Sequence, residues 1–505
     1  MKRTILILTL LITLSLACSL NGLTGGGDDT VTQNEPPPQS ENRCGDDVCD
    51  GPENTDNCPE DCNATIPDAG EAAAPSEENN VAGMANAEYS ILYHIVEHTV
   101  ASNQMSGAKC YTFTFRKYLD GGHVQPDGSG NEILELQDYP TSMITSKKHD
   151  NFYYISSPIS PIFENYGIEM FDWDVEGQTL WASAFANNNP VEFAKSVGGK
   201  FPGGATTSPE NEYLVYLITQ KTGENQSQPG GFMPNNMNPF LSDSNLIVAN
   251  LKNGGETTAL SGNYNRQLFT SLADLSADGN SFYTIAKEGE SFQFVKISLE
   301  SGKATGFPEI FPGFDWRMVN WDELFPKAND FAYASFSISP DEKRLIAYKN
   351  IFTANLDNPC FTEASHHLWV FNLEENTTDS FKNQDGYVSD SAWKYDSSEF
   401  TLSIMGSSGC YPDYLDSSIE ILDKDGENRS TLVNEPKSKI TNLGWSPDGS
   451  VIVYDVYTTD LIGRLKLVDV STKQVDEIIN TQALGYAVSQ SAPVTLLFAD
   501  WVSTK

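Results

Sequence analysis

The chain has 505 residues, of which 69 are acidic and 31 are basic, so its formal charge is −38. A surface this acidic repels nucleic-acid phosphates and anionic lipid headgroups. It therefore excludes a nucleic-acid partner and favours divalent cations and cationic ligands. The content of glycine, proline and aromatic residues is typical of a turn-rich β protein.

Residues 1–18 have the pattern of an export signal. A basic start precedes an apolar run over residues 5–16, which is shorter than the roughly twenty residues of a membrane-spanning helix. The sequence Leu-Ser-Leu-Ala-Cys that ends at Cys18 resembles a bacterial lipobox, although its second and third positions depart from the commoner order. The resemblance implies that Cys18 is acylated and anchors an exported protein in a membrane of the cell envelope, outside the cytoplasm. An ordinary signal peptide is the alternative.

Two stretches, residues 19–43 and 63–87, are rich in small, polar and proline residues. Neither carries enough apolar side chains to bury a core. We expect both to be disordered linkers.

A small cysteine-rich module lies between these linkers, at residues 44–62. Its spacing is C-x4-C-x8-C-x3-C, formed by Cys44, Cys49, Cys58 and Cys62. In an exported protein a segment this small needs covalent stabilisation, so the spacing predicts two disulfides. Three pairings are open. A four-cysteine zinc site is the alternative, but the usual C-x2-C pairs are absent.

The same module is dense in oxygen ligands of the kind that Ca²⁺ prefers, namely Asp46, Asp47, Asp50, Glu53, Asp56 and Asp61. It resembles short Cys-Gly-Asp modules of exported prokaryotic proteins and, more distantly, the calcium-binding repeats of Notch-type receptors, whose third disulfide it lacks. We expect one bound calcium ion, and the alternative is a solvated acidic knot. Calorimetry on residues 40–66 with millimolar Ca²⁺ tests this expectation.

From residue 88 to residue 505, strand-like segments follow one another and a motif recurs. The clearest copy is Gly-Trp-Ser-Pro-Asp-Gly at residues 444–449, followed by the apolar strand Val451 to Tyr457. Aligned copies place the serine, or Lys394 in its stead, at positions 146, 208, 276, 339, 394 and 446. The interval suits a four-stranded blade with its loops.

The aromatic-Ser-Pro-Asp-Gly motif followed by an Ile/Val-Tyr strand resembles the TolB-type repeat of the WD-repeat-like propeller class. The resemblance implies an all-β fold, a β-propeller. The motif's aspartates are expected to accept backbone N–H bonds in turns rather than to act in catalysis; they are Asp278, Asp341, Asp396 and Asp448.

Six motif copies are visible, and the two ends of the domain suggest a seventh blade. Residues 493–498 form a strand with no later partner, and residues 111–115 and 133–136 form strands with no motif before them. Pairing these ends would close the ring and remove its exposed edges. We therefore predict seven blades, with six or eight as alternatives. Residues 89–100 are left over and are expected to supply a further strand.

The remaining cysteines are Cys110, Cys360 and Cys410. Cys360 and Cys410 each follow the Tyr-type strand of consecutive repeats, and equivalent loops of neighbouring blades emerge on the same face. This placement predicts a disulfide between them and leaves Cys110 as a free thiol.

One catalytic string occurs, the H-x-x-E-H pattern from His94 to His98. The corresponding zinc peptidases need it on a helix, whereas these residues favour a strand. A Gly/Pro/Asn-rich insertion at residues 228–240 is either a binding loop or a disordered insertion. We expect a non-enzymatic binding or scaffold propeller for a protein or polysaccharide. The alternative is a secreted hydrolase or lyase with an active site at the channel mouth.

Overall fold

The computed structural model describes residues 89–105, 108–134, 139–145, 151–157, 179–184, 191–195, 200–207, 212–220, 243–261, 273–288, 291–306, 330–354, 362–375, 377–406, 416–488 and 493–503. All of them belong to the unit Val81–Lys505.

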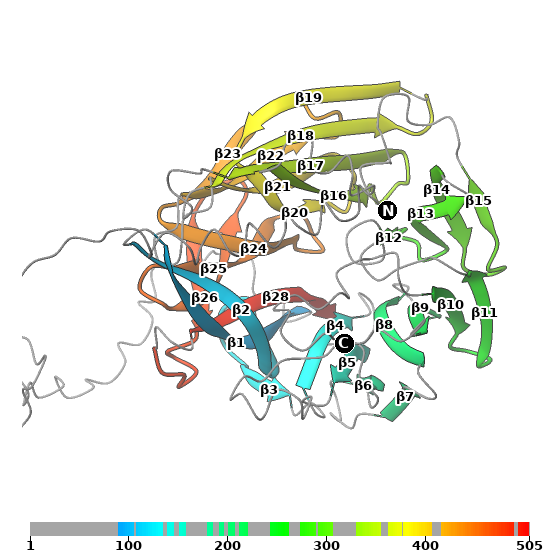
Figure 1. Cartoon of the computed structure of the whole chain (residues 1–505), viewed down its shortest axis with the longest axis horizontal. Coiled ribbons are helices and arrows are strands. Elements are labelled where there is room, and N and C mark those ends of the chain that lie inside the picture. Colours follow the sequence, from blue (N-terminus) through cyan, green and yellow to red (C-terminus); the bar gives the residue numbers. More distant parts are fainter. Residues whose placement is uncertain are drawn as a thin grey trace, which may run out of the picture. The chain divides into compact units, whose positions relative to one another are not determined.

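The described residues form seven four-stranded antiparallel sheets, which are the blades of a β-propeller (Figure 1). The fold class and the blade number predicted above are confirmed. The first blade joins β28 (Val494–Ser503), β1 (Tyr89–Met105), β2 (Ala108–Val124) and β3 (Glu132–Leu134). The second and third are β4 (Tyr139–Thr145), β5 (Asn151–Ser157), β6 (Thr179–Ala184) and β7 (Val191–Lys195), then β8 (Lys200–Thr207), β9 (Tyr213–Gln220), β10 (Asp243–Asn250) and β11 (Gly255–Leu260).

The other four blades follow in chain order. The fourth is β12 (Ala273–Leu275), β13 (Ser281–Glu288), β14 (Ser291–Ser298) and β15 (Ala304–Gly306), and the fifth is β16 (Asp330–Ile338), β17 (Arg344–Ala354), β18 (Thr362–Asn372) and β19 (Thr377–Asp385). The sixth is β20 (Tyr387–Trp393), β21 (Glu399–Met405), β22 (Ser417–Asp423) and β23 (Ser430–Glu435), and the seventh is β24 (Ser438–Trp445), β25 (Val451–Thr458), β26 (Gly463–Asp469) and β27 (Val475–Asn480).

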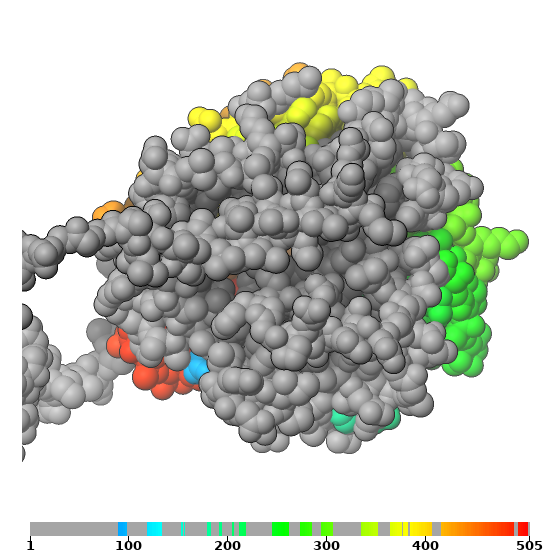
Figure 2. Space-filling model, in the orientation of Figure 1, coloured from blue at the N-terminus to red at the C-terminus, as the bar shows by residue number. Residues whose placement is uncertain are grey.

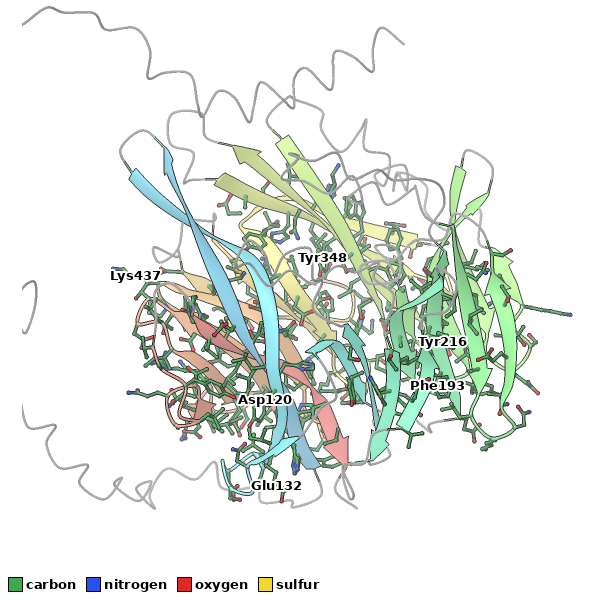
Figure 3. All side chains as sticks on the ribbon, turned by 60° about the horizontal axis from the view of Figure 1, so that its bottom comes forward. Asp120, Glu132, Phe193, Tyr216, Tyr348 and Lys437 are labelled. Atoms are coloured by element: carbon green, nitrogen blue, oxygen red, sulfur yellow. The ribbon has the colours of Figure 1, made fainter. Side chains whose placement is uncertain are left out.

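The core lies between the blades. The second strand β25 is buried along nearly its whole length, whereas the outer strand β27 alternates between exposed and partly buried residues. A strand covered on both faces reads as a continuous apolar run, and one with a solvated face alternates. Neighbouring blades interlock through aromatic rings: Phe193 of β7 meets Tyr216 of β9 edge to face, with 6.1 Å between ring centroids (Figure 3).

The repeated motif occupies the turn between the first and second strands of its blade. After β24, Ser446 Oγ donates to Asp448 Oδ1 (2.6 Å), and the N–H of Ser450 donates to the same oxygen (3.0 Å). The N–H of Val451 donates to Ser446 Oγ (3.1 Å). In the equivalent turns, backbone N–H groups donate to Asp278, Asp341 and Asp396. Carboxylates that accept such bonds fix the turn and thereby the pairing of the two strands.

Both ends of the propeller domain contribute to the first blade, as predicted. β28 pairs antiparallel with β1, and Figure 1 shows the red strand beside the blue one. β28 takes the position of a first strand, in contact with β24 on one side and β4 on the other. β28 is the last strand of the propeller and β1 the first, so no motif turn joins this pair. This is why six motif copies serve seven blades.

The expectation for residues 89–100 needs a correction. They are not an addition to a blade built from other strands, because they form most of β1, the strand to which β28 is directly hydrogen-bonded. The pairing of the C-terminal strand is therefore with this segment. The strand that contains residues 111–115 is the next one outward, β2.

Candidate functional site

Many residues predicted as functional lie outside the described residues. These are Cys18, the four cysteines and six acidic residues of the module at 44–62, Cys360, Cys410 and the insertion at 228–240. The strands that flank Cys360 are β17 and β18, and those that flank Cys410 are β21 and β22. Each cysteine is thus in the connection between the second and third strands of consecutive blades.

The H-x-x-E-H string lies in a β-strand, β1, as its composition indicated. His94 is 6 % exposed, and burial lowers the pKa of its imidazole to about 4. It is therefore neutral at physiological pH. Within the ranges that the structure covers, no group of three or more His, Cys, Asp and Glu side chains could hold a metal ion. No helix in those ranges is long and apolar enough to cross a membrane.

A pocket of ≈ 360 Å³ lies between the fifth and sixth blades. It is lined by Arg344, Val370, Asn372, Glu375, Thr377, Asp379, Lys424 and Asp425. One wall is the β18–β19 turn, the other is the β22–β23 turn, and buried Val370 of β18 is among the lining residues. In Figure 2 the yellow atoms of the fifth blade and the start of the sixth reach the surface along the upper edge of the view.

Hydrogen bonds from backbone N–H groups to side chains hold the two turns that form the walls of the pocket. In the β18–β19 turn, Asn372 Oδ1 accepts the N–H groups of Glu374 and Glu375, both at 3.1 Å. In the β22–β23 turn, Asp423 Oδ1 accepts the N–H of Asp425 (3.1 Å), and Gly426 takes a φ of 80°. A side chain there would meet Val370 and Phe381 of the fifth blade, so glycine is needed for the close approach of the two blades.

The charges in the pocket divide into a paired and an unpaired set. Arg344 contacts Asp425 through Nε (3.1 Å) and Nη2 (3.0 Å), and Lys424 also pairs with Asp425. These cations hold the pKa of the Asp425 carboxyl below its usual range. The carboxylates of Glu375 and Asp379 are both exposed, and neither forms an ion pair with a described residue. The pocket therefore offers two negatively charged hydrogen-bond acceptors.

The carboxyls whose pKa is raised lie elsewhere, inside the ring. Burial raises the pKa of Asp390 in β20 to about 7, and the nearby carboxyl of Asp455 adds to the effect. Burial raises the pKa of Asp455 in β25 to about 6. Both groups accept backbone N–H bonds between blades, from Leu443 (2.9 Å) and Phe498 (3.0 Å) respectively. Their positions give them a role in joining blades.

Asp274 of β12 joins blades in the same way. Its Oδ2 accepts the N–H of Ile338 (2.7 Å) and the hydroxyl of Ser337 (2.9 Å), both in β16 of the next blade. These three aspartates were not predicted from the sequence. The available signal was a single acidic residue within or beside an otherwise apolar strand, as with Asp455 in Val451 to Tyr457.

A buried ion pair joins the sixth and seventh blades. Glu435 of β23 is 7 % exposed; it accepts the hydroxyl of Tyr454 (2.7 Å) and the ammonium of Lys466 (2.9 Å). Burial, with the Glu435 charge added, raises the pKa of Tyr454 well above its usual range, so the phenol remains a donor. The three side chains come from two blades and form a single polar network between them.

The architecture thus defines the class of protein, a seven-bladed all-β propeller. No protein-family model matches the sequence, and no curated protein matches it. Among solved structures, the chain is similar to the propeller domain of the Trilobed protease from Pyrococcus furiosus, with 12 % identity, 67 % of this chain and 84 % of that chain covered, and a TM-score of 0.41.

Two further structures illustrate the range of such likenesses. TolB from Acinetobacter baumannii has 12 % identity, with 81 % of this chain and 82 % of that chain covered and a TM-score of 0.34. An oligogalacturonate lyase from Vibrio parahaemolyticus has 7 % identity, with 73 % and 94 % covered and a TM-score of 0.42. These likenesses concern the fold alone.

Proposed function

We propose that the protein is an exported, lipid-anchored binding module whose propeller takes a protein segment with basic side chains into the pocket between the fifth and sixth blades. The observation that carries the proposal is the pair of carboxylates, Glu375 and Asp379, that line this pocket without an ion-pair partner among the described residues. An ammonium or guanidinium group forms charge-assisted hydrogen bonds with such acceptors. The formal charge of −38 would steer a basic partner towards the propeller.

A protein ligand is favoured over a polysaccharide by the composition of the pocket. The residues that line it include two cations, three acidic side chains, a threonine and an asparagine, and none of them is aromatic. A sugar ring would find no aromatic face there on which to stack. A basic side chain would find two carboxylates and the hydroxyl of Thr377.

The pocket proposal is tested by exchanging both carboxylates for amides, Glu375→Gln with Asp379→Asn. We expect about tenfold weaker retention of envelope proteins on the immobilised mature protein, because two exposed ion pairs are lost. The matched control is Glu300→Gln with Asp476→Asn, which removes two charges from the outer turns and strands of the fourth and seventh blades and should leave retention unchanged.

Three results would contradict the proposal. Equal losses in the two double variants would show that the overall charge, not the pocket, retains the partners. Retention abolished by glycosidase treatment would point to a polysaccharide ligand. Turnover of a glycan panel by the purified propeller would identify an enzyme.

The anchor is tested separately with Cys18→Ser. Acylation of this cysteine would hold the mature chain at a membrane, so its removal should move most of the protein from the membrane fraction to the soluble extracytoplasmic fraction. Fractionation with immunoblotting measures the change, and mass spectrometry of the mature N-terminus identifies the lipid. An unchanged distribution with an unmodified N-terminus would contradict the anchor and leave the pocket proposal standing.

A further inference from the structure

A bulge in the inner strand of the seventh blade lies between two carboxyls, that of buried Asp455 and that of partly buried Asp390. The register between β24 and β25 shifts between Ile440 and Leu443, so the N–H groups of the two bulged residues have no ladder partner. Asp455 accepts both: Thr441 N–H at 3.1 Å and Asn442 N–H at 3.2 Å. The Asn442 amide also donates to it, at 2.6 Å.

The two carboxyls connect this bulge to the blades on either side. Asp390 of β20 in the sixth blade accepts the N–H of Leu443 at 2.9 Å. Asp455 accepts the N–H of Phe498, in β28 of the first blade, at 3.0 Å. Three consecutive N–H groups of β24 and one of β28 are thus held by two carboxyls. The last strand, which closes the ring, is fixed to the seventh blade through Asp455.

We propose that Asp390 and Asp455 form a proton-sensitive latch, which holds the last strand in the ring more firmly in acid than at neutral or alkaline pH. Asp455 is 1 % exposed, and neither carboxyl has an ion-pair partner among the described residues. A buried carboxyl with a second carboxyl nearby and no cation favours its protonated form. Raising the pH removes that proton and leaves uncompensated charge at the junction.

The charged groups on the adjoining strands are engaged elsewhere. On β26, Arg464 pairs with Asp460 and Glu477, and Lys466 pairs with Glu435. On β28, Asp500 accepts the N–H of Trp501, and His94 of β1, opposite Leu497, is neutral above a pKa of about 4. On β24, Lys439 precedes the bulge and has an interaction of its own. We therefore expect Asp390 and Asp455 to be the groups that change protonation at the junction.

The direction of the pH effect follows from the pKa values. Burial raises the pKa of Asp390 to about 7 and that of Asp455 to about 6, whereas the pKa of an unfolded aspartate is about 3.9. At pH values between these, the folded protein therefore binds more protons than the unfolded chain. Stabilisation is complete below the unfolded pKa and is lost as the pH rises through the folded values.

Hydrogen exchange of the full chain, compared with intrinsic exchange rates at pH 5 and pH 8, tests the latch. We expect the protection of β28 and β24 amides to fall at least about tenfold towards pH 8, since a shift of more than one pKa unit corresponds to that factor. Amides of β13 and β14 in the fourth blade serve as the internal reference. Equal changes in both regions, or no change at β28, would overturn the latch.

The variant Asp390→Asn keeps the shape of the side chain and removes its charge. In this variant, the change in amide protection of β28 and β24 between pH 5 and pH 8 should be less than half of that in the natural chain. Asp448→Asn is the matched control, because this turn aspartate has a lowered pKa and lies outside the junction. An Asp390→Asn variant with the full pH dependence would overturn the latch, and the comparison of the natural chain at two pH values remains decisive if the variant does not fold.

Discussion

Replacing Gly463 with valine should lower the free energy of unfolding by about 3 kcal/mol, because the new side chain would displace the strand that closes the ring. A Cβ atom at Gly463 would lie 2.7 Å from the backbone nitrogen of Leu496 and 2.8 Å from the Cα of Thr495. Both are backbone atoms of β28, so the clash cannot be relieved by a rotamer change. Urea unfolding followed by tryptophan fluorescence measures the loss.

Gly255→Val is the matched control. Gly255 also begins a strand, β11, and its nearest neighbour is the side-chain oxygen of the exposed Asn253, which can move away. Its substitution should change the free energy of unfolding by less than about 0.5 kcal/mol. Similar losses at the two glycines would argue against tight packing of β28 on the seventh blade.

Replacing Glu435 with alanine should cost about 3 kcal/mol, because it leaves Lys466 and the Tyr454 hydroxyl partly or fully buried without their shared acceptor. The side chains of Lys466 and Glu435 are only 17 % and 10 % exposed, so water replaces the lost contact poorly. Because the network spans β23, β25 and β26, the loss should loosen the boundary between the sixth and seventh blades. Chemical unfolding gives the magnitude, and exchange of β23 and β25 amides gives the location.

Two comparisons separate the network from charge removal in general. Glu477→Ala removes a 37 % exposed carboxylate from β27 whose partner, Arg464, keeps Asp460; it should cost less than about 1 kcal/mol. The double variant Glu435→Ala with Lys466→Met should cost less than the sum of the single changes, because no charge is then left buried. Additive effects would mean that the pair is not coupled.

The repeat motif made the blades predictable because its chemistry is local. Asp448 and Gly449 act within one turn, and the residues that follow fill the second strand of the same blade. Even so, the position of Gly449 is occupied by Glu342 and Ser397 in other copies, and these adopt φ values of 59° and 61°. The turn geometry therefore persists where the glycine signal is lost, because the aspartate and the flanking strands hold it.

The candidate site was far less predictable. The Asp-Lys-Asp-Gly sequence at residues 423–426 is typical of a hairpin turn, but its contact with Arg344 depends on the packing of two neighbouring blades and joins residues 81 positions apart in sequence. The roles of Asp390 and Asp455 likewise depend on partners in other blades. No local pattern distinguishes a buried acidic residue that joins two blades from one that faces solvent.

The sequence by itself determined the all-β class, the repeated blades and the closure of the ring by both ends of the domain, because turn chemistry and strand periodicity act over a few residues. Only the tertiary structure decided that Tyr89–Met105 pairs with the last strand, that three aspartates join neighbouring blades, and that two hairpins enclose a pocket. The physical reason is that these contacts are made between blades, where burial and backbone approach, rather than local preference, select the partners.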